Sequence, residues 1–373
     1  MKAVQTHIRL CVILILIVVP YVMADSPYHF QELTDDSPSP PPQPTVGPGG
    51  NEYVHGAVTT NGPYWAAGHS GNDNYLYYIY EPAQPTPVEA PAVFFLHGWK
   101  GTEPRSYGAW IEHIVKKGYV VVWGQYQAGS VTLPWLFPGY AISAWRDALE
   151  RLNTEPSHVR VEKDYKDSYK TAIVGHSAGG YLSVILAAMA GKTENGIPRP
   201  YAVVAIEPGG LGIIPHSDFS QIDKDTYVII VVGNNDDVVC KSTAVFVWNE
   251  IASIYENDKD FLLVRSDSHG SPTMIADHYF PTTLGFFQDA QGLDAFDFFV
   301  TFKLSVGALN CSFKRSDCEY ALGHGSSEQV DMGKWSDGRP LAPMVWVEDP
   351  NLLETTCEDP APMGCCSRPV SSP

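Results

Sequence analysis

The sequence predicts an α/β fold, with a mostly parallel central sheet and helices on both faces. Apolar runs of strand length alternate along the chain with segments of helical periodicity, which is typical of this class. One strand and helix are joined by a sharp glycine-rich turn around residues 175–180. The chain has 373 residues, of which 44% are hydrophobic and 12% aromatic, enough for a substantial core.

The elements follow one another in a regular order after residue 74. A helix is expected between most successive strands, so neighbouring strands run parallel. The predicted strands are residues 75–80, 92–96, 119–123, 171–174, 201–206, 227–232 and 261–264. The predicted helices are residues 106–117, 141–153, 181–190 and 243–255, and an amphipathic helix with a disulfide loop is expected within 294–318.

The turn around Ser177 carries the strongest chemical signal. Its sequence is Gly-His-Ser-Ala-Gly-Gly, and it lies between a predicted strand and a predicted helix. A serine in such a turn is held at strained backbone angles, with its hydroxyl exposed above the sheet. Gly175 and Gly179 leave room where side chains would clash. A serine hydroxyl is a weak nucleophile, so it needs a base and an acid later in the chain.

Candidates for both partners follow the next strands. Asp236 and Asp237 come directly after the strand at 227–232, and His269 comes just after the strand at 261–264. Reactive groups gather at the carboxyl ends of parallel strands. We therefore expect Ser177 as nucleophile and His269 as general base. His278 is the rival base, disfavoured because no strand directly precedes it.

The order serine, acid, histidine with a full Gly-x-Ser-x-Gly turn resembles the α/β-hydrolase superfamily across residues 75–310. Within it, the chain looks like a secreted serine esterase or lipase of the dienelactone-hydrolase or cutinase-like branch. The resemblance favours Asp236 over Asp237, since Gly233, Asp236 and Val239 match a Gly-x-x-Asp-x-x-Val pattern.

The resemblance also implies an oxyanion hole. Its two donors would be the backbone N–H groups of Ala178 and Trp99, the latter in the His-Gly-Trp loop after the strand at 92–96. His97 and His176 are expected to have structural roles. No cofactor and no metal ion are expected.

Charge and the N-terminus indicate the compartment and the partners. The net charge of −18 argues against nucleic acid and anionic membrane surfaces. Lys2 and Arg9 precede an apolar stretch at 10–19, and a small-residue site ends at Ala24, as in a secretory signal. The stretch ends at Pro20, which is short for a transmembrane helix, so we expect cleavage, secretion and no stable membrane span.

Composition divides the chain into four parts. These are a signal peptide at 1–24, a proline-rich extended or disordered linker at 25–50, a hydrolase domain at 51–324 and a Cys/Pro-rich extension at 325–373. Six cysteines remain after signal cleavage, an even number that favours disulfides over zinc. Cys311 is expected to pair with Cys318, and Cys357 with Cys365 or Cys366.

Together these features predict a secreted hydrolase that cleaves a small or polymeric carboxylic ester through an acyl-enzyme on Ser177. A serine peptidase or amidase of the same fold is the alternative, and so is a catalytically inactive binding protein. The loop at 124–140 holds Tyr126, Trp135, Phe137 and Tyr140. These aromatic side chains either line a substrate pocket or pack the loop itself.

Overall fold

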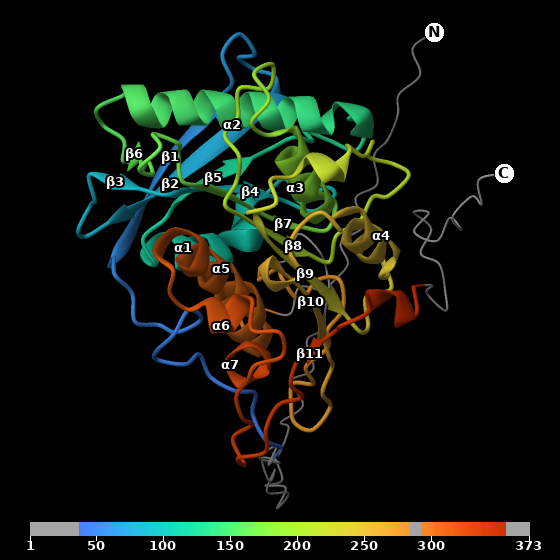
Figure 1. Ribbon diagram of the computed structural model, residues 1–373. Coiled ribbons are helices and arrows are strands. Elements are labelled where there is room, and N and C mark those ends of the chain that lie inside the picture. The colour runs from blue at the N-terminus through green and yellow to red at the C-terminus, as the bar shows by residue number, and fades with distance from the viewer. Residues whose placement is uncertain (1–36, 284–291, 356–373) are drawn as a thin grey trace, which may run out of the picture. The chain divides into compact units, whose positions relative to one another are not determined.

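The computed structural model describes residues 37–283 and 292–355 of the chain. Its main sheet has nine strands in the order β1-β2-β5-β4-β7-β8-β9-β10-β11 (Figure 1). Their bounds are β1 Ala57–Trp65, β2 Leu76–Ala83, β4 Ala92–Leu96, β5 Val120–Gly124, β7 Thr171–His176, β8 Ala202–Ile206, β9 Tyr227–Gly233, β10 Lys259–Val264 and β11 Val345–Trp346. β3 (Glu89–Ala90) and β6 (Arg160–Val161) form a separate two-stranded sheet.

Six neighbouring strands of this sheet run parallel, namely β5, β4, β7, β8, β9 and β10. β1, β2 and β11, toward the edges, run antiparallel to their neighbours. The parallel strands are apolar at nearly every position because both faces of the sheet are covered. In β4, Phe94 and Leu96 point into one core cluster, whereas Val93 and Phe95 point into the other. The predicted mostly parallel sheet is confirmed.

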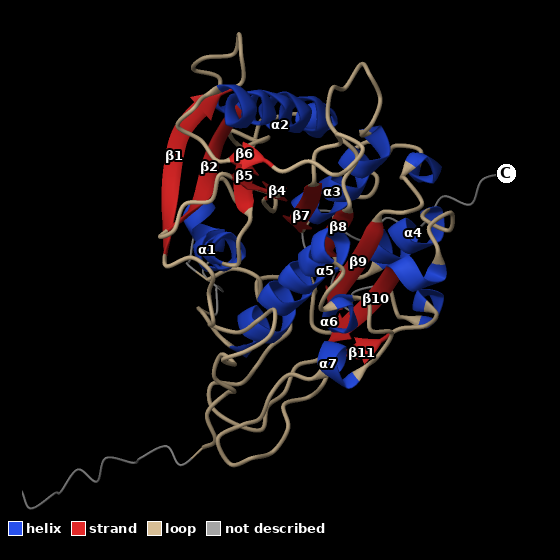
Figure 2. Cartoon of the chain, turned by 60° about the vertical axis from the view of Figure 1, so that its left-hand side comes forward, coloured by secondary structure: helices blue, strands red, loops and turns tan. Residues whose placement is uncertain are grey.

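Two groups of helices cover the sheet (Figure 2). Residues of α2, α3 and α4 fill the core on one face, and residues of α1 and α5 fill it on the other. A π-helix at Asp297–Phe302 leads directly into α5. The helix bounds are α1 Gly108–Lys116, α2 Phe137–Thr154, α3 Ala178–Met189, α4 Ser242–Glu250, α5 Lys303–Lys314, α6 Cys318–Ala321 and α7 Ser327–Val330.

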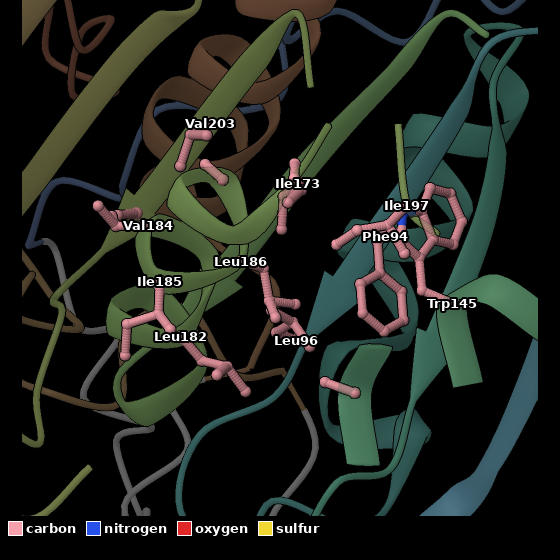
Figure 3. Close-up of a cluster of buried hydrophobic side chains, with 14 of the residues drawn as sticks. Phe94, Leu96, Trp145, Ile173, Leu182, Val184, Ile185, Leu186, Ile197 and Val203 are labelled. Carbon is pink, nitrogen blue, oxygen red and sulfur yellow. The ribbon is translucent and has the colours of Figure 1, made fainter. Parts of the chain in front are cut away.

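Side chains of the central strands pack against side chains of α2 and α3 in one core cluster (Figure 3). Phe94 of β4 stacks on Trp145 of α2, with ring centroids 4.9 Å apart. Leu182 and Leu186 of α3 lie in the same cluster, and both are fully buried. Burial of an aromatic or leucine side chain contributes about 1.5–3 kcal/mol, so this packing fixes α3 against the strands on either side of the Ser177 turn.

Most predicted elements are present, with shifted ends. α2 begins four residues before the predicted start at 141, and α4 ends at Glu250 rather than 255. β1 and β11 were not predicted. Both are edge strands, and β11 has only two residues, too few for a periodic pattern.

The described part of the predicted linker is bonded to the rest of the domain. Residues 37–50 contain no helix or strand, yet they pack against the domain. Ser39 exchanges two hydrogen bonds with Ser336, and the Pro38 carbonyl accepts one from the Ser271 N–H at 3.0 Å. Prolines suit an extended strap because they need no N–H partner. The predicted signal peptide lies outside the described residues.

The C-terminal extension is part of the same sheet. β11 pairs antiparallel with β10, at Val345 opposite Leu263 and Trp346 opposite Leu262. The predicted disulfide between Cys311 and Cys318 is confirmed.

Cys240 is also disulfide-bonded. The predictions for Cys357, Cys365 and Cys366 fall outside the described residues. Across residues 37–283 and 292–355, no helix combines the length and apolarity needed to cross a bilayer.

Candidate active site

Ser177 lies in the sharp turn between β7 and α3. Its backbone has φ +57° and ψ −124°, a strained conformation for a residue with a side chain. The turn is fixed by backbone hydrogen bonds from Ser177 N–H to the Ile206 carbonyl at 2.9 Å and from Gly209 N–H to the Ser177 carbonyl at 3.0 Å. The strain is therefore held by β8 and the loop after it, as a nucleophile elbow requires.

The glycines beside Ser177 are required by close backbone approach. A Cβ on Gly175 would overlap the Gly179 carbonyl, and one on Gly179 would overlap the carbonyls of Leu96 and His97. Any side chain at these positions would push the helix away from the strands. The turn therefore also brings the loop after β4 against the nucleophile.

A continuous line of hydrogen bonds connects Ser177 to a histidine and a carboxylate. His278 Nε2 lies 2.8 Å from Ser177 Oγ, and His278 Nδ1 lies 2.9 Å from Asp236 Oδ2. A carboxylate can only accept, so Nδ1 carries the proton and Nε2 accepts the serine hydroxyl proton. All three residues are at most 5% exposed, and water competes little for these bonds.

Asp236 is well suited to hold the histidine. Its second oxygen, Oδ1, accepts the backbone N–H groups of Val238 at 2.9 Å and Val239 at 3.0 Å. These bonds fix the carboxylate in the turn after β9. Asp237 is exposed. The structure therefore brings Asp236, and not its neighbour, to the nucleophile.

The prediction that His269 lies beside Ser177 is wrong. His269 Nε2 is 2.7 Å from Asp337 Oδ2, and Arg339 donates to its Nδ1 at 2.8 Å, so both ring nitrogens contact the C-terminal extension. The cause is a small loop after β10, closed by mutual backbone hydrogen bonds between Asp267 and Met274. His269 belongs to this loop.

His278 follows the return of the chain to the sheet. Met274 and Ala276 are buried, and the Ala276 carbonyl accepts the N–H of Asn235 at 3.0 Å, next to Asp236. The available sequence signal was the pair of apolar residues at positions 274 and 276, which indicates that the chain re-enters the core two residues before His278. No strand directly precedes His278, so the position of strand ends alone does not indicate this histidine.

The loop after β4 approaches the nucleophile from the other side. A Cβ on Gly98 would lie 3.2 Å from Ser177 Cβ, which places the predicted oxyanion loop beside the serine. His97 Nδ1 donates to the Gly98 carbonyl at 2.7 Å, and burial lowers the pKa of His97 to about 4. His97 thus braces the loop as a neutral ring. The roles of Trp99 and Ala178 as donors stay predictions.

A buried relay links this loop to the histidine. Gly98 N–H donates to the Tyr107 hydroxyl at 2.8 Å, and that hydroxyl donates to His176 Nδ1 at 2.9 Å. His176 Nε2–H then donates to the His278 carbonyl at 2.9 Å. Burial holds the pKa of His176 well below its usual value, so the ring stays neutral and keeps this pattern. His176 points away from the serine hydroxyl, as predicted for a structural residue.

One buried acid beside the site has no counterpart among the predicted site residues. Glu207 follows β8 directly and is fully buried. Its Oε2 lies 3.6 Å from His278 Nδ1 and 3.7 Å from His176 Nε2. The signal was a single acidic residue ending an apolar strand beside the Ser177 turn.

His176, Glu207 and His278 are close enough together to hold a metal ion. However, every ring nitrogen of the two histidines already has a hydrogen-bond partner. An ion bound there would have to displace the hydrogen bonds from His278 Nδ1 to Asp236 and from His176 Nε2 to the His278 carbonyl. The residues present therefore fit a hydrogen-bonded site better than a metal centre.

The aromatic residues of the loop at 124–140 divide between core and surface. Tyr126 and Phe137 are fully buried, with ring centroids 5.0 Å apart, so they pack the loop itself. Trp135 is 59% exposed. Trp99 contacts Phe137 at a centroid distance of 5.3 Å and is half-buried. The loop therefore has a packed base and an exposed apolar rim.

No protein-family model matches the chain, and no curated protein matches it. Similar solved structures include two of esterase B from Lactobacillus rhamnosis, one with a C4-C4 SN3 tributyrin phosphonate and one C6-C4 SN3 inhibited. Each is 18% identical, with a TM-score of 0.46. The matches cover 62% of this chain and 80% and 82% of the esterase chains.

The fold follows from the chain's own topology. A mostly parallel sheet with helices on both faces carries Ser177 in a strand–turn–helix elbow, and Asp236 and His278 follow on the loops after β9 and β10. This chain order on this sheet is that of the α/β-hydrolases. The predicted α/β-hydrolase fold is confirmed.

Proposed function

We propose that this protein is a serine hydrolase that cleaves carboxylic esters through an acyl-enzyme on Ser177. The observation that carries the proposal is the unbroken line from Ser177 Oγ to His278 Nε2 and from His278 Nδ1 to Asp236 Oδ2. Each distance is within the range in which a proton can pass or be held. The strained serine turn presents the hydroxyl to the substrate.

Each residue has one task in the reaction. Ser177 Oγ attacks the ester carbonyl carbon while His278 Nε2 takes the hydroxyl proton. The tetrahedral intermediate then expels the alcohol, which receives that proton from His278. His278 then takes a proton from water, which attacks the acyl-enzyme. The carboxylic acid product is released, and His278 returns the proton to Ser177 Oγ. Asp236 holds the histidine tautomer and stabilises the imidazolium.

The oxyanion of the intermediate needs donors that point at it. The Ala178 N–H at the start of α3 is one proposed donor, and the Trp99 N–H is the second. The support is the position of Gly98, whose added Cβ would contact Ser177 Cβ. The relay through Tyr107 and His176 would keep this loop and the base at a fixed spacing.

The test uses p-nitrophenyl esters of graded acyl length and a fluorophosphonate probe. We expect the native protein to hydrolyse the esters and to be labelled once, and Ser177→Ala to lose both properties. Ser183→Ala is the matched control, because Ser183 lies in α3 with its hydroxyl bonded to the Gly180 carbonyl. Native protein that is neither labelled nor active would contradict the proposal and favour a binding protein.

Amide substrates separate the two hydrolase classes. We expect p-nitroanilides to be cleaved far more slowly than esters, because an amine leaves less readily than a phenolate or an alcohol. Faster cleavage of p-nitroanilides that also depends on Ser177 would instead assign a peptidase or amidase.

We also propose that the chain is secreted after cleavage behind Ala24. The support is the signal-like pattern of residues 2–24 and the disulfide between Cys311 and Cys318. N-terminal sequencing of protein from the medium of expressing cells should begin at Asp25. Protein retained in the cell with residues 1–24 attached would contradict it.

A further inference from the structure

Glu207 is the buried acid that the proposed mechanism does not use. It follows β8 in a left-handed backbone conformation, with φ +46°, which a non-glycine residue adopts at a cost. Its N–H donates to the Val231 carbonyl at 2.7 Å, so β9 holds this conformation. Space for the side chain comes from Gly233, where a Cβ would lie 2.6 Å from Glu207 Oε1.

The carboxyl group points at the catalytic histidine. Glu207 Oε2 lies 3.6 Å from His278 Nδ1, the same atom that Asp236 Oδ2 contacts at 2.9 Å. Among the described residues, neither Glu207 oxygen makes a hydrogen bond of normal length and angle, although the backbone N–H of Gly233 lies close enough to favour the charged form. Unpartnered buried carboxyl groups are costly and unusual. A fold that maintains one next to the base suggests a use for it.

Two aspartates lie near this group. Burial raises the pKa of Glu207 well above its usual value, and the charge of Asp236 adds to this. Two carboxylates that share a site do not both ionise readily. The two backbone N–H groups that bond to Oδ1 stabilise the negative charge on Asp236 rather than on Glu207. The titratable or charged groups facing Glu207 are His176 from β7, Asp236 and Lys241 from the segment after β9, and Asp277 and His278 from the loop after β10.

We propose that Glu207 is a second acid for His278, which accepts the Nδ1–H whenever Asp236 cannot. Loss of the Asp236 charge removes one of the effects that oppose ionisation of Glu207, and leaves burial and the charge of Asp277. The carboxylate then needs to move by about 0.7 Å, from 3.6 to 2.9 Å, to make the missing bond. Glu207 is thus a positioning residue. This inference rests on the proposed hydrolase function.

The experiment compares Asp236→Asn, Glu207→Gln and the double variant by kcat on a p-nitrophenyl ester. Loss of the acid in a triad without a substitute lowers kcat by about 10⁴-fold. We expect Asp236→Asn alone to lose only about 10–100-fold, and the double variant to approach 10⁴-fold. Glu207→Gln alone should lose a few-fold at most. Asp237→Asn is the surface control for charge.

The pH profile separates this role from simple packing. In Asp236→Asn, kcat should rise with pH as Glu207 ionises, and this rise should vanish in the double variant. Glu207→Asp in the Asp236→Asn background should restore part of it, because it keeps a carboxyl group. Thermal melts and the stoichiometry of fluorophosphonate labelling show whether each variant is folded.

The inference is overturned if Asp236→Asn is already as slow as the double variant and has the same pH profile. A second pair of results would also overturn it. Glu207→Gln would unfold the protein and abolish labelling, and Glu207→Asp in the Asp236→Asn background would show no rise of kcat with pH. Either result leaves the proposed function standing if native protein is labelled at Ser177. Absence of native labelling would instead remove the proposed function itself.

Discussion

Two histidines nine positions apart in the segment after β10 have opposite surroundings. His278 is 4% exposed and bonds to Ser177 and Asp236. The His269 ring is partly exposed and bonds to Asp337 and Arg339 of the C-terminal extension. The first completes a reactive site, and the second ties an external loop to a neighbouring segment.

The difference shows that distance from a strand end does not decide which histidine reaches the serine. His269 is nearer to the end of β10, yet the loop closed by Asp267 and Met274 carries it away from the sheet edge. His278 is farther along the chain but follows the point where Ala276 bonds back to the loop after β9. Burial and the return of the chain determine which residue is placed to act as base.

The largest expected effect comes from changing His278 to alanine, with His269→Ala as the comparison. His278→Ala should lower kcat for ester hydrolysis by about 10⁴–10⁶-fold, since removal of a triad base has effects of this size. His269→Ala should keep kcat within a few-fold, because its ring contacts neither Ser177 nor Asp236. Steady-state kinetics measure both. A severe loss in His269→Ala at unchanged thermal stability would contradict this assignment.

The sequence predicted the Ser177 elbow and Asp236 because both depend on local patterns. Glycines two positions either side of the serine mark the turn, and the acid sits at a fixed spacing after Gly233. His278 could not be predicted as readily, since its position depends on the hydrogen bonds between Asp267 and Met274. Loops of this kind bring residues together without a periodic signal.

The role of Glu207 depends still more on tertiary structure. An acidic residue after an apolar strand is unremarkable in sequence, and only the distance to His278 Nδ1 gives it meaning. Similarly, prolines predicted an extended or disordered linker at residues 25–50, whereas Pro38 and Ser39 are bonded to residues far along the chain. Contacts over such sequence separations leave no pattern in either segment.

Substitutions at two glycines test the difference between the two regions without changing a histidine. A Cβ on Gly233 would overlap the Ala276 carbonyl and crowd Glu207, so Gly233→Ala should displace the segment that carries His278. We expect kcat to fall by about 100-fold or more, as for a shift of about 1 Å at a catalytic group. Kinetics at matched concentrations of folded protein measure this.

The matched variant is Gly270→Ala in the external loop. Its Cβ would overlap the Pro38 carbonyl and crowd Trp335, which lie away from the serine. Overpacking of this kind costs about 1–3 kcal/mol. We therefore expect a lower thermal midpoint with kcat within a few-fold of native. Equal losses of kcat in the two glycine variants would show that displacement of the external loop also displaces the catalytic groups.

The smallest expected effect concerns the carboxylates that hold the His269 loop. Burial would raise the pKa of Asp267, but hydrogen bonds from His269 N–H, Trp335 Nε1–H and Ala342 N–H together lower it. A lowered pKa in the folded state stabilises the fold above the unfolded value, about 3.9, and this is lost as pH falls through the folded value. Asp267→Asn should therefore cost about 1–2 kcal/mol at pH 7.

The pH dependence of the thermal midpoint distinguishes Asp267 from the exposed Asp337. Thermal melts of Asp267→Asn and native protein should converge as pH falls from about 3.9 through the lower pKa of folded Asp267, below which the native side chain has lost its charge. Asp337→Asn should shift the melt less at every pH, since exposed ion pairs contribute little. If Asp337→Asn were the more damaging change, the surface contact of His269, rather than the three bonds to Asp267, would hold the loop in place.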